Sequence, residues 1–150
     1  MDYILRQYFK IRQKRIQKVA LKPLPFQQAI LRSILDFNKN CLYGQSYDFI
    51  NLKSYQTFQS KVPLVQYEDI VDHVNDMMQG VPSVLCSNKV NWFAKSSGTS
   101  NDRSKFIPVT IDYLKHGHLK CAWDAASIIY HEDPSAKLFK DRSLIMGGSL

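Results

Sequence analysis

The sequence has few cysteines, no long apolar run and none of the motifs that mark secretion. Its three cysteines, Cys41, Cys86 and Cys121, are widely spaced among 150 residues, and none belongs to a C-x-x-C pair. Such an odd set excludes a disulfide framework and shows no zinc-binding pattern. No apolar stretch approaches the roughly 18 residues of a membrane span, and the N-terminus has no signal-peptide pattern. We therefore expect a cytoplasmic protein with no metal-ligand cluster of its own and no membrane partner.

The net charge of +7 is concentrated at the N-terminus. Residues 1–22 contain seven basic side chains and one acidic side chain, whereas the remaining residues are close to neutral. A basic segment of this kind raises an alternative function, a module that binds nucleic acid or an anionic membrane. The aromatic residues of the segment lie with its aliphatic residues and do not alternate with the basic ones, so we expect no specific nucleic-acid partner.

The first half of the chain shows helical periodicity. A basic amphipathic helix is predicted over residues 1–22, ended by prolines, with an apolar face made of Ile4, Leu5, Tyr8, Phe9, Ile16 and Val19. Arg12 intrudes on this face and is expected to extend its charge toward water. A second helix follows, with Phe26, Ile30, Ile34 and Leu35 inward. After a short helix at 54–60, residues 67–80 predict a helix that ends at Gly80 and buries Ile70, Val71, Val74, Met77 and Met78.

The second half predicts strands around a polar loop. Residues 90–94 and 106–109 have the composition of short strands, so 90–110 is expected to form a strand, a loop and a strand. Thr110 is positioned to cap a helix over 111–130, whose inner face would contain Leu114, His118, Cys121, Ala122, Ala125 and Ile129. A further strand is predicted at 144–147. This order predicts an α/β protein in which N-terminal helices precede part of a mixed sheet, and an incomplete sheet of this kind would favour self-association.

The loop between the two strands has a composition suited to phosphate. Ser96, Ser97, Thr99 and Ser100 offer hydroxyl groups, and Gly98 lets backbone N–H groups approach an anion. Lys105 adds a cation at the end of the loop. The loop matches neither the Walker A pattern nor the Rossmann pattern. A solvated hairpin turn remains an equal interpretation of these residues.

Two longer blocks carry a family resemblance. The stretch "SSGTSNDRSKFIP" resembles the phosphate-binding signature of the adenylate-forming superfamily, which includes acyl-CoA synthetases and luciferases. The block "LYGQSYDFINLKSYQTFQSKVPLVQYEDIVDHVNDMMQG", followed by "NWFAKSSGTS", is similar to the auxin-responsive promoter family of acyl-acid amido synthetases in plants and bacteria. The resemblance extends from about the second helix to the last strand.

The resemblance implies an ATP-dependent ligase that uses Mg²⁺. Such an enzyme activates a carboxylic acid as an acyl-adenylate and transfers the acyl group to an amine, such as an amino acid. By this resemblance, Ser96, Ser97, Thr99, Ser100 and Lys105 would contact the β- and γ-phosphates of ATP, and Gly98 would permit the turn of the binding loop. Leu114, His118 and Cys121 are candidates to face the acyl-acid pocket, although we prefer the interpretation that this apolar helical face belongs to the core. Family members are about three times longer, so we expect an N-terminal fragment of the large domain, inactive alone and without identifiable catalytic residues. An inert structural fragment is the remaining alternative.

Two further groups of polar side chains have a structural interpretation. Tyr67, Glu68 and Asp69 could form a functional cluster, but acidic residues also favour a helix N-terminus, and we prefer that interpretation. His73 is expected to be solvated.

Overall fold

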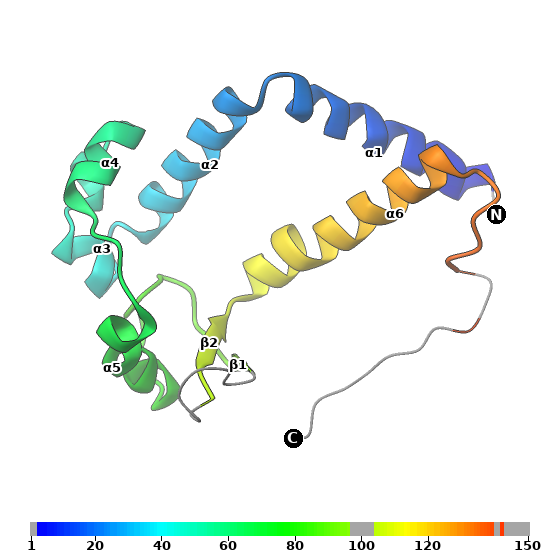
Figure 1. Cartoon of the computed structure of the whole chain (residues 1–150). Coiled ribbons are helices and arrows are strands. Elements are labelled where there is room, and N and C mark those ends of the chain that lie inside the picture. Colours follow the sequence, from blue (N-terminus) through cyan, green and yellow to red (C-terminus); the bar gives the residue numbers. More distant parts are fainter. Residues whose placement is uncertain (1–2, 97–103, 140–141, 143–150) are drawn as a thin grey trace. The chain divides into compact units, whose positions relative to one another are not determined.

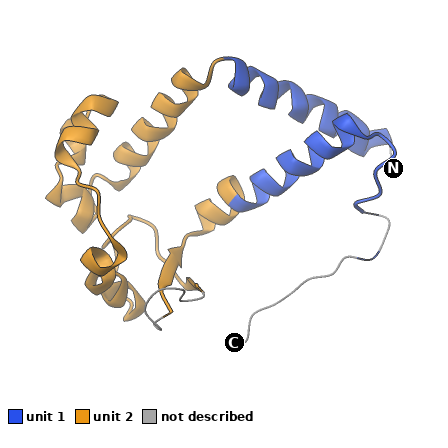
Figure 2. Cartoon of the chain, viewed as in Figure 1, with its two compact units in different colours: residues 1–21, 118–150 blue, residues 22–117 orange. Residues whose placement is uncertain are grey.

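The computed structural model describes residues 3–96, 104–139 and 142 (Figure 1). The chain divides into two compact units, one formed by 1–21 with 118–150 and the other by 22–117 (Figure 2). The predicted strand at 144–147 lies outside the described residues. Among the described helices, none is both long and apolar enough to cross a membrane.

The first unit pairs α1 (Tyr3–Leu21) with α6 (Lys120–Glu132). Phe9 is buried and its ring stacks on that of Tyr130, with centroids 5.3 Å apart. The buried Ser127 hydroxyl donates a hydrogen bond of 3.0 Å to the Phe9 carbonyl, so the two helices are joined by polar as well as apolar contacts. The helix at 1–22 is thus confirmed, but three residues of its predicted apolar face, Ile4, Tyr8 and Val19, are exposed.

Arg12 contributes to this pairing. It forms an ion pair with Asp124, and its Nη2 donates a hydrogen bond of 3.0 Å to the Lys120 carbonyl. The expectation that the Arg12 charge extends to water was therefore wrong. A basic residue on a helical face can turn inward when the facing helix offers a carboxylate.

The predicted helix over 111–130 changes pitch along its length. Its start is confirmed, because the Thr110 hydroxyl accepts a hydrogen bond of 3.0 Å from the Tyr113 N–H. Residues Tyr113–Leu119 then form a π-helical segment before α6 begins. In a π-helix the backbone hydrogen bonds join residues i and i+5, whereas in an α-helix they join i and i+4. Residues that would share one face of a continuous α-helix therefore lie on different faces before and after the π-helical segment. Four residues of the predicted inner face within α6 are consequently exposed, namely Cys121, Ala122, Ala125 and Ile129.

The second unit begins with a helical layer. Its first helices are α2 (Pro23–Asn38), α3 (Leu42–Ser46), the 3-10 turn η1 (Phe49–Asn51) and α4 (Tyr55–Lys61). Leu35 of α2 packs against Phe49 and Leu52 to form the core of this layer. The predicted inward residues Ile30 and Ile34 are instead exposed, because Leu31 and Leu35, one turn apart, form the face that packs on the core.

Gly44 allows α3 to lie against the end of α2. A Cβ atom at this position would come within 2.0 Å of the Asn38 carbonyl oxygen, closer than any side chain can approach. The start of α3 is also hydrogen-bonded to the segment that follows α5. The Leu42 N–H donates to the Ser83 carbonyl at 2.8 Å, and the Tyr43 N–H donates to the Val84 carbonyl at 3.0 Å.

Helix α5 (Tyr67–Met78) confirms the helix predicted over 67–80. Val74 and Met77 are buried, Met78 is exposed, and the chain turns at Gly80 with a φ of 90°. His73 is half-buried, with its ring edge-on to Tyr43 at 6.4 Å, so the expectation of a solvated histidine was wrong.

The sheet consists of β1 (Trp92–Lys95) and β2 (Phe106–Val109) in the part of the chain that the structure describes. The two strands are antiparallel, with Trp92 opposite Val109 and Lys95 opposite Phe106. Helices followed by strands were predicted, and that order is confirmed. The described sheet is a single antiparallel pair in a largely helical chain.

Candidate functional site

The two ends of the predicted phosphate loop meet at the end of the β1–β2 hairpin where the loop joins the two strands. The Ser96 N–H donates a hydrogen bond of 2.9 Å to the Lys105 carbonyl, and the Lys105 N–H donates to the Ser96 hydroxyl oxygen at 3.3 Å. Sequence analysis predicted both residues as phosphate contacts, and the structure places them opposite each other. The other four predicted contacts, Ser97, Gly98, Thr99 and Ser100, lie outside the described residues.

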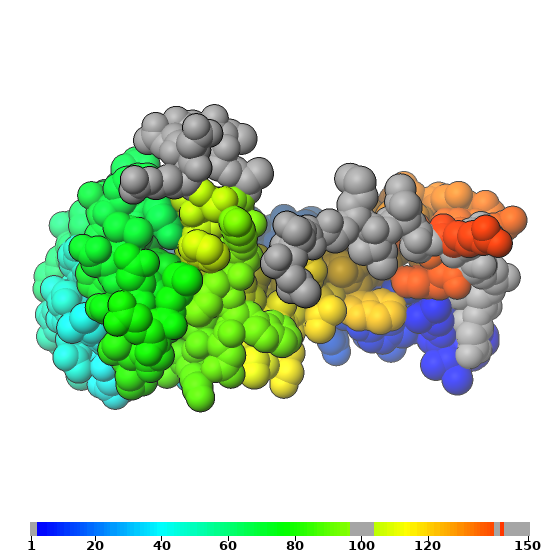
Figure 3. All heavy atoms as spheres, turned by 90° about the horizontal axis from the view of Figure 1, so that it is seen from below, coloured from blue at the N-terminus to red at the C-terminus, as the bar shows by residue number. Residues whose placement is uncertain are grey.

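Helix α5 lies beside β2 and supplies the neighbours of Lys105 (Figure 3). The Tyr67 hydroxyl accepts a hydrogen bond of 3.0 Å from the Phe106 N–H and contacts the Phe106 carbonyl oxygen at 3.3 Å. Along an antiparallel ladder, hydrogen-bonded residue pairs alternate with pairs that share no hydrogen bond. Ser96 and Lys105 form a hydrogen-bonded pair, so the next pair, Lys95 and Phe106, shares none. The backbone N–H and carbonyl of Phe106 therefore point away from β1. Tyr67 therefore satisfies the backbone groups on the free edge of β2.

The Lys105 ammonium has two neighbours on the first turn of α5. It lies 3.1 Å from Oε1 of Glu68 and 5.2 Å from the centre of the Tyr67 ring. The second distance is within the range of a cation–π contact. Both charged side chains reach solvent, with exposed fractions of 41% for Lys105 and 64% for Glu68, so water screens the ion pair. A hydrogen bond from the backbone N–H of Glu68 and, after it, the ammonium of Lys105 lower the pKa of the Glu68 carboxyl.

The three residues at the start of α5 have different roles. The Asp69 carboxylate accepts a hydrogen bond of 2.7 Å from the Gln66 N–H and forms a capping box, as expected of an acidic residue in the first turn of a helix. Glu68 pairs with Lys105, and Tyr67 bonds to β2. The interpretation that these residues serve the helix N-terminus is thus confirmed for Asp69. It did not include the contact of Glu68 with Lys105 or that of Tyr67 with β2. No local pattern could have shown these contacts, because the partners lie in a different element.

The predicted acyl-pocket residues differ in exposure. Leu114 is half-buried, whereas His118 and Cys121 are exposed. The start of their helix is held in the second unit by a hydrogen bond of 2.7 Å that the Asn88 amide donates to the Asp112 carboxylate. Within the described part of the chain, no group of three His, Cys, Asp or Glu side chains could hold a metal ion.

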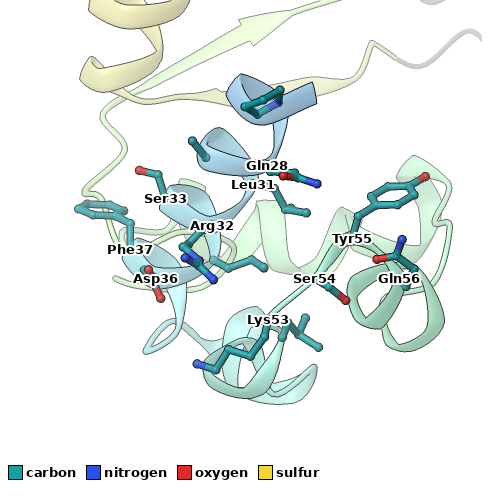
Figure 4. A pocket seen from close by; sticks show the side chains of 14 residues that line it. Gln28, Leu31, Arg32, Ser33, Asp36, Phe37, Lys53, Ser54, Tyr55 and Gln56 are labelled. Atoms are coloured by element: carbon teal, nitrogen blue, oxygen red, sulfur yellow. The ribbon is translucent and has the colours of Figure 1, made fainter. Parts of the chain in front are cut away.

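A surface groove lies elsewhere in the second unit. It has a volume of about 950 Å³ and runs along α2 and the segment 52–56 (Figure 4). Its charged lining groups are Arg32, Asp36 and Lys53, and none of the predicted site residues lines it.

The protein class follows from comparison with known families. The model of the GH3 family N-terminal domain matches residues 12–146, which is most of the chain. The chain therefore belongs to the GH3 family, in agreement with the resemblance seen in its sequence.

Two curated relatives are plant enzymes. Over 107 residues the chain is 34% identical to indole-3-acetic acid-amido synthetase GH3.2 of Arabidopsis thaliana, a match that covers 71% of this chain and 20% of the relative. It is 30% identical over 108 residues to the probable indole-3-acetic acid-amido synthetase GH3.7 of Oryza sativa subsp. japonica, covering 66% of this chain and 17% of the relative. The chain thus spans about a fifth of the length of these relatives.

A solved structure has the same fold. The AtGH3.15 acyl acid amido synthetase in complex with 2,4-DB superposes with a TM-score of 0.73 at 27% identity, over 82% of this chain and 21% of that one. The fold described above is therefore the N-terminal part of the acyl acid amido synthetase fold.

Proposed function

We propose that this chain is the N-terminal part of an ATP-dependent acid-amido synthetase, and that its hairpin loop binds the phosphates of ATP. The whole enzyme would activate a carboxylic acid as an acyl-adenylate and transfer the acyl group to an amine, such as an amino acid. The acid and the amine are not specified by the residues described here.

One observation carries the assignment of the loop. Lys105 immediately precedes β2, opposite Ser96, and its ammonium reaches solvent. A phosphate group needs a cation and several hydrogen-bond donors at short range. The Ser96 hydroxyl accepts from the Lys105 N–H and can still donate its own proton to an anion.

Two described residues, Lys105 and Ser96, suit the phosphate oxygens of a magnesium–nucleotide complex. Bound Mg²⁺ would neutralise charge on the phosphate oxygens, and it prefers carboxylate and phosphate ligands. The role of the chain is to hold and orient the phosphates: Lys105 supplies a positive charge, Ser96 a hydroxyl, and the hairpin fixes the distance between them. Leu114, His118 and Cys121 are proposed to face the acyl acid.

Isothermal titration of Mg-ATP into the chain and into Lys105→Ala tests the assignment. Each hydrogen bond to a charged oxygen contributes roughly 1.5–3 kcal/mol, so we expect the variant to lose at least about tenfold in affinity. Lys89→Ala is the matched control, because it removes the same charge from an exposed lysine ahead of β1. Equal affinities for all three proteins would refute a phosphate contact by Lys105.

A further inference from the structure

The proposed phosphate-binding lysine already has an anionic partner. The Glu68 carboxylate lies 3.1 Å from the Lys105 ammonium, within direct ion-pair distance. A phosphate oxygen that binds this ammonium must approach the same positive charge that the carboxylate neutralises. The two anions also repel each other because they carry charges of the same sign.

The groups that surround this ion pair are held in place independently of it. The start of α5 is fixed by the capping box between Gln66 and Asp69. The start of β2 is fixed by the Tyr67 hydroxyl, which bonds both backbone groups of Phe106. The backbones that carry Glu68 and Lys105 therefore stay in place when their ion pair opens.

The Glu68 side chain is also free to move. With an exposed fraction of 64%, most of the side chain faces solvent, into which it can rotate away from Lys105. A solvent-exposed ion pair is weak, so a multiply charged phosphate can overcome it. Lys105 would keep its contact with the Tyr67 ring during the exchange, because that contact does not involve Glu68.

We propose that Glu68 is the resident counter-ion of Lys105, which a polyphosphate must displace in order to bind. The inference rests on the proposed function of the loop and adds a residue that lowers the affinity of the site for phosphate. Glu68 thereby acts as a specificity-determining residue: it disfavours weakly charged anions, whose attraction to one lysine cannot overcome the existing ion pair.

The test uses inorganic tripolyphosphate without divalent metal as the probe, titrated calorimetrically into the chain, Glu68→Gln and Asp72→Asn. Glu68→Gln keeps the shape of the side chain and removes its charge. Asp72→Asn removes one charge from an exposed position on the same helix, so it reports the general effect of net charge. We expect Glu68→Gln to bind roughly fivefold more tightly than Asp72→Asn, because the competition for Lys105 and the repulsion of phosphate by the carboxylate are both lost.

The Lys105→Ala variant separates this inference from the proposed function. If Lys105→Ala weakens binding and Glu68→Gln binds no more tightly than Asp72→Asn, the counter-ion role is refuted while the phosphate site stands. If Lys105→Ala leaves tripolyphosphate binding unchanged, both ideas are refuted. A merely structural Glu68 would give a variant that binds equally or more weakly, so tighter binding supports the counter-ion role alone.

Discussion

The contact between Tyr67 and β2 yields a prediction about the edge of the hairpin. In Tyr67→Phe the ring remains beside Lys105, and only the hydroxyl is lost. The Phe106 N–H then loses the hydroxyl to which it donates a hydrogen bond of 3.0 Å, and the Phe106 carbonyl loses its contact of 3.3 Å with the same hydroxyl. A donor left unsatisfied costs about 1–3 kcal/mol when buried, and because this edge is only partly buried we expect about 1–2 kcal/mol.

Native-state hydrogen exchange measures this cost at the affected atom. A loss of about 1–2 kcal/mol corresponds to roughly 5- to 30-fold faster exchange of the Phe106 amide hydrogen. Tyr113→Phe removes the hydroxyl of an exposed tyrosine in the same unit and should leave that amide unaffected. Unchanged protection of Phe106 in Tyr67→Phe would refute the argument that the hydroxyl satisfies the free strand edge.

Two other contacts lead to separate predictions. Gly44→Ala would place a Cβ within 2.0 Å of the Asn38 carbonyl oxygen, so we expect a loss of about 2 kcal/mol or more in urea unfolding; an unchanged midpoint would contradict this. In Lys105→Ala the pKa of the Glu68 carboxyl should rise only part of the way to its usual value, because the backbone N–H that contributes most to the lowering remains. NMR titration measures this pKa, and a pKa that does not rise would exclude the ion pair in solution. Because the carboxyl pKa is lowered in the folded chain, the ion pair stabilises at pH above the ordinary pKa and is lost as the pH falls through the lowered value.

The helices whose positions depend on local chemistry were predicted well. Thr110 caps its helix as expected, and α5 begins with acidic residues and ends before Gly80. These signals act over one or two turns, so the sequence alone contains them. The two strands were identified for the same reason, since strand composition and turn residues are local features.

The inward faces of the longer helices were predicted less well. In α2, Leu31 and Leu35 face the core while Ile30 and Ile34 are exposed, although all four are equally apolar. Helical periodicity defines several candidate faces when apolar residues are this frequent, and the partner element selects one of them. Beyond Tyr113 the π-helical segment changes the register itself, which no apolar pattern signalled.

The candidate site shows the same division between local and long-range information. The hydroxyl-rich segment and Lys105 could be predicted as a phosphate-binding motif from sequence because they are contiguous, and this role stays a prediction. Glu68 was assigned to helix capping, the role that its neighbour Asp69 performs. Its pairing with Lys105 depends on α5 packing against β2, which is a property of the tertiary structure. A binding motif read from sequence therefore names the groups that attract the ligand, whereas a group that competes with the ligand becomes visible only once the neighbouring helix is in place.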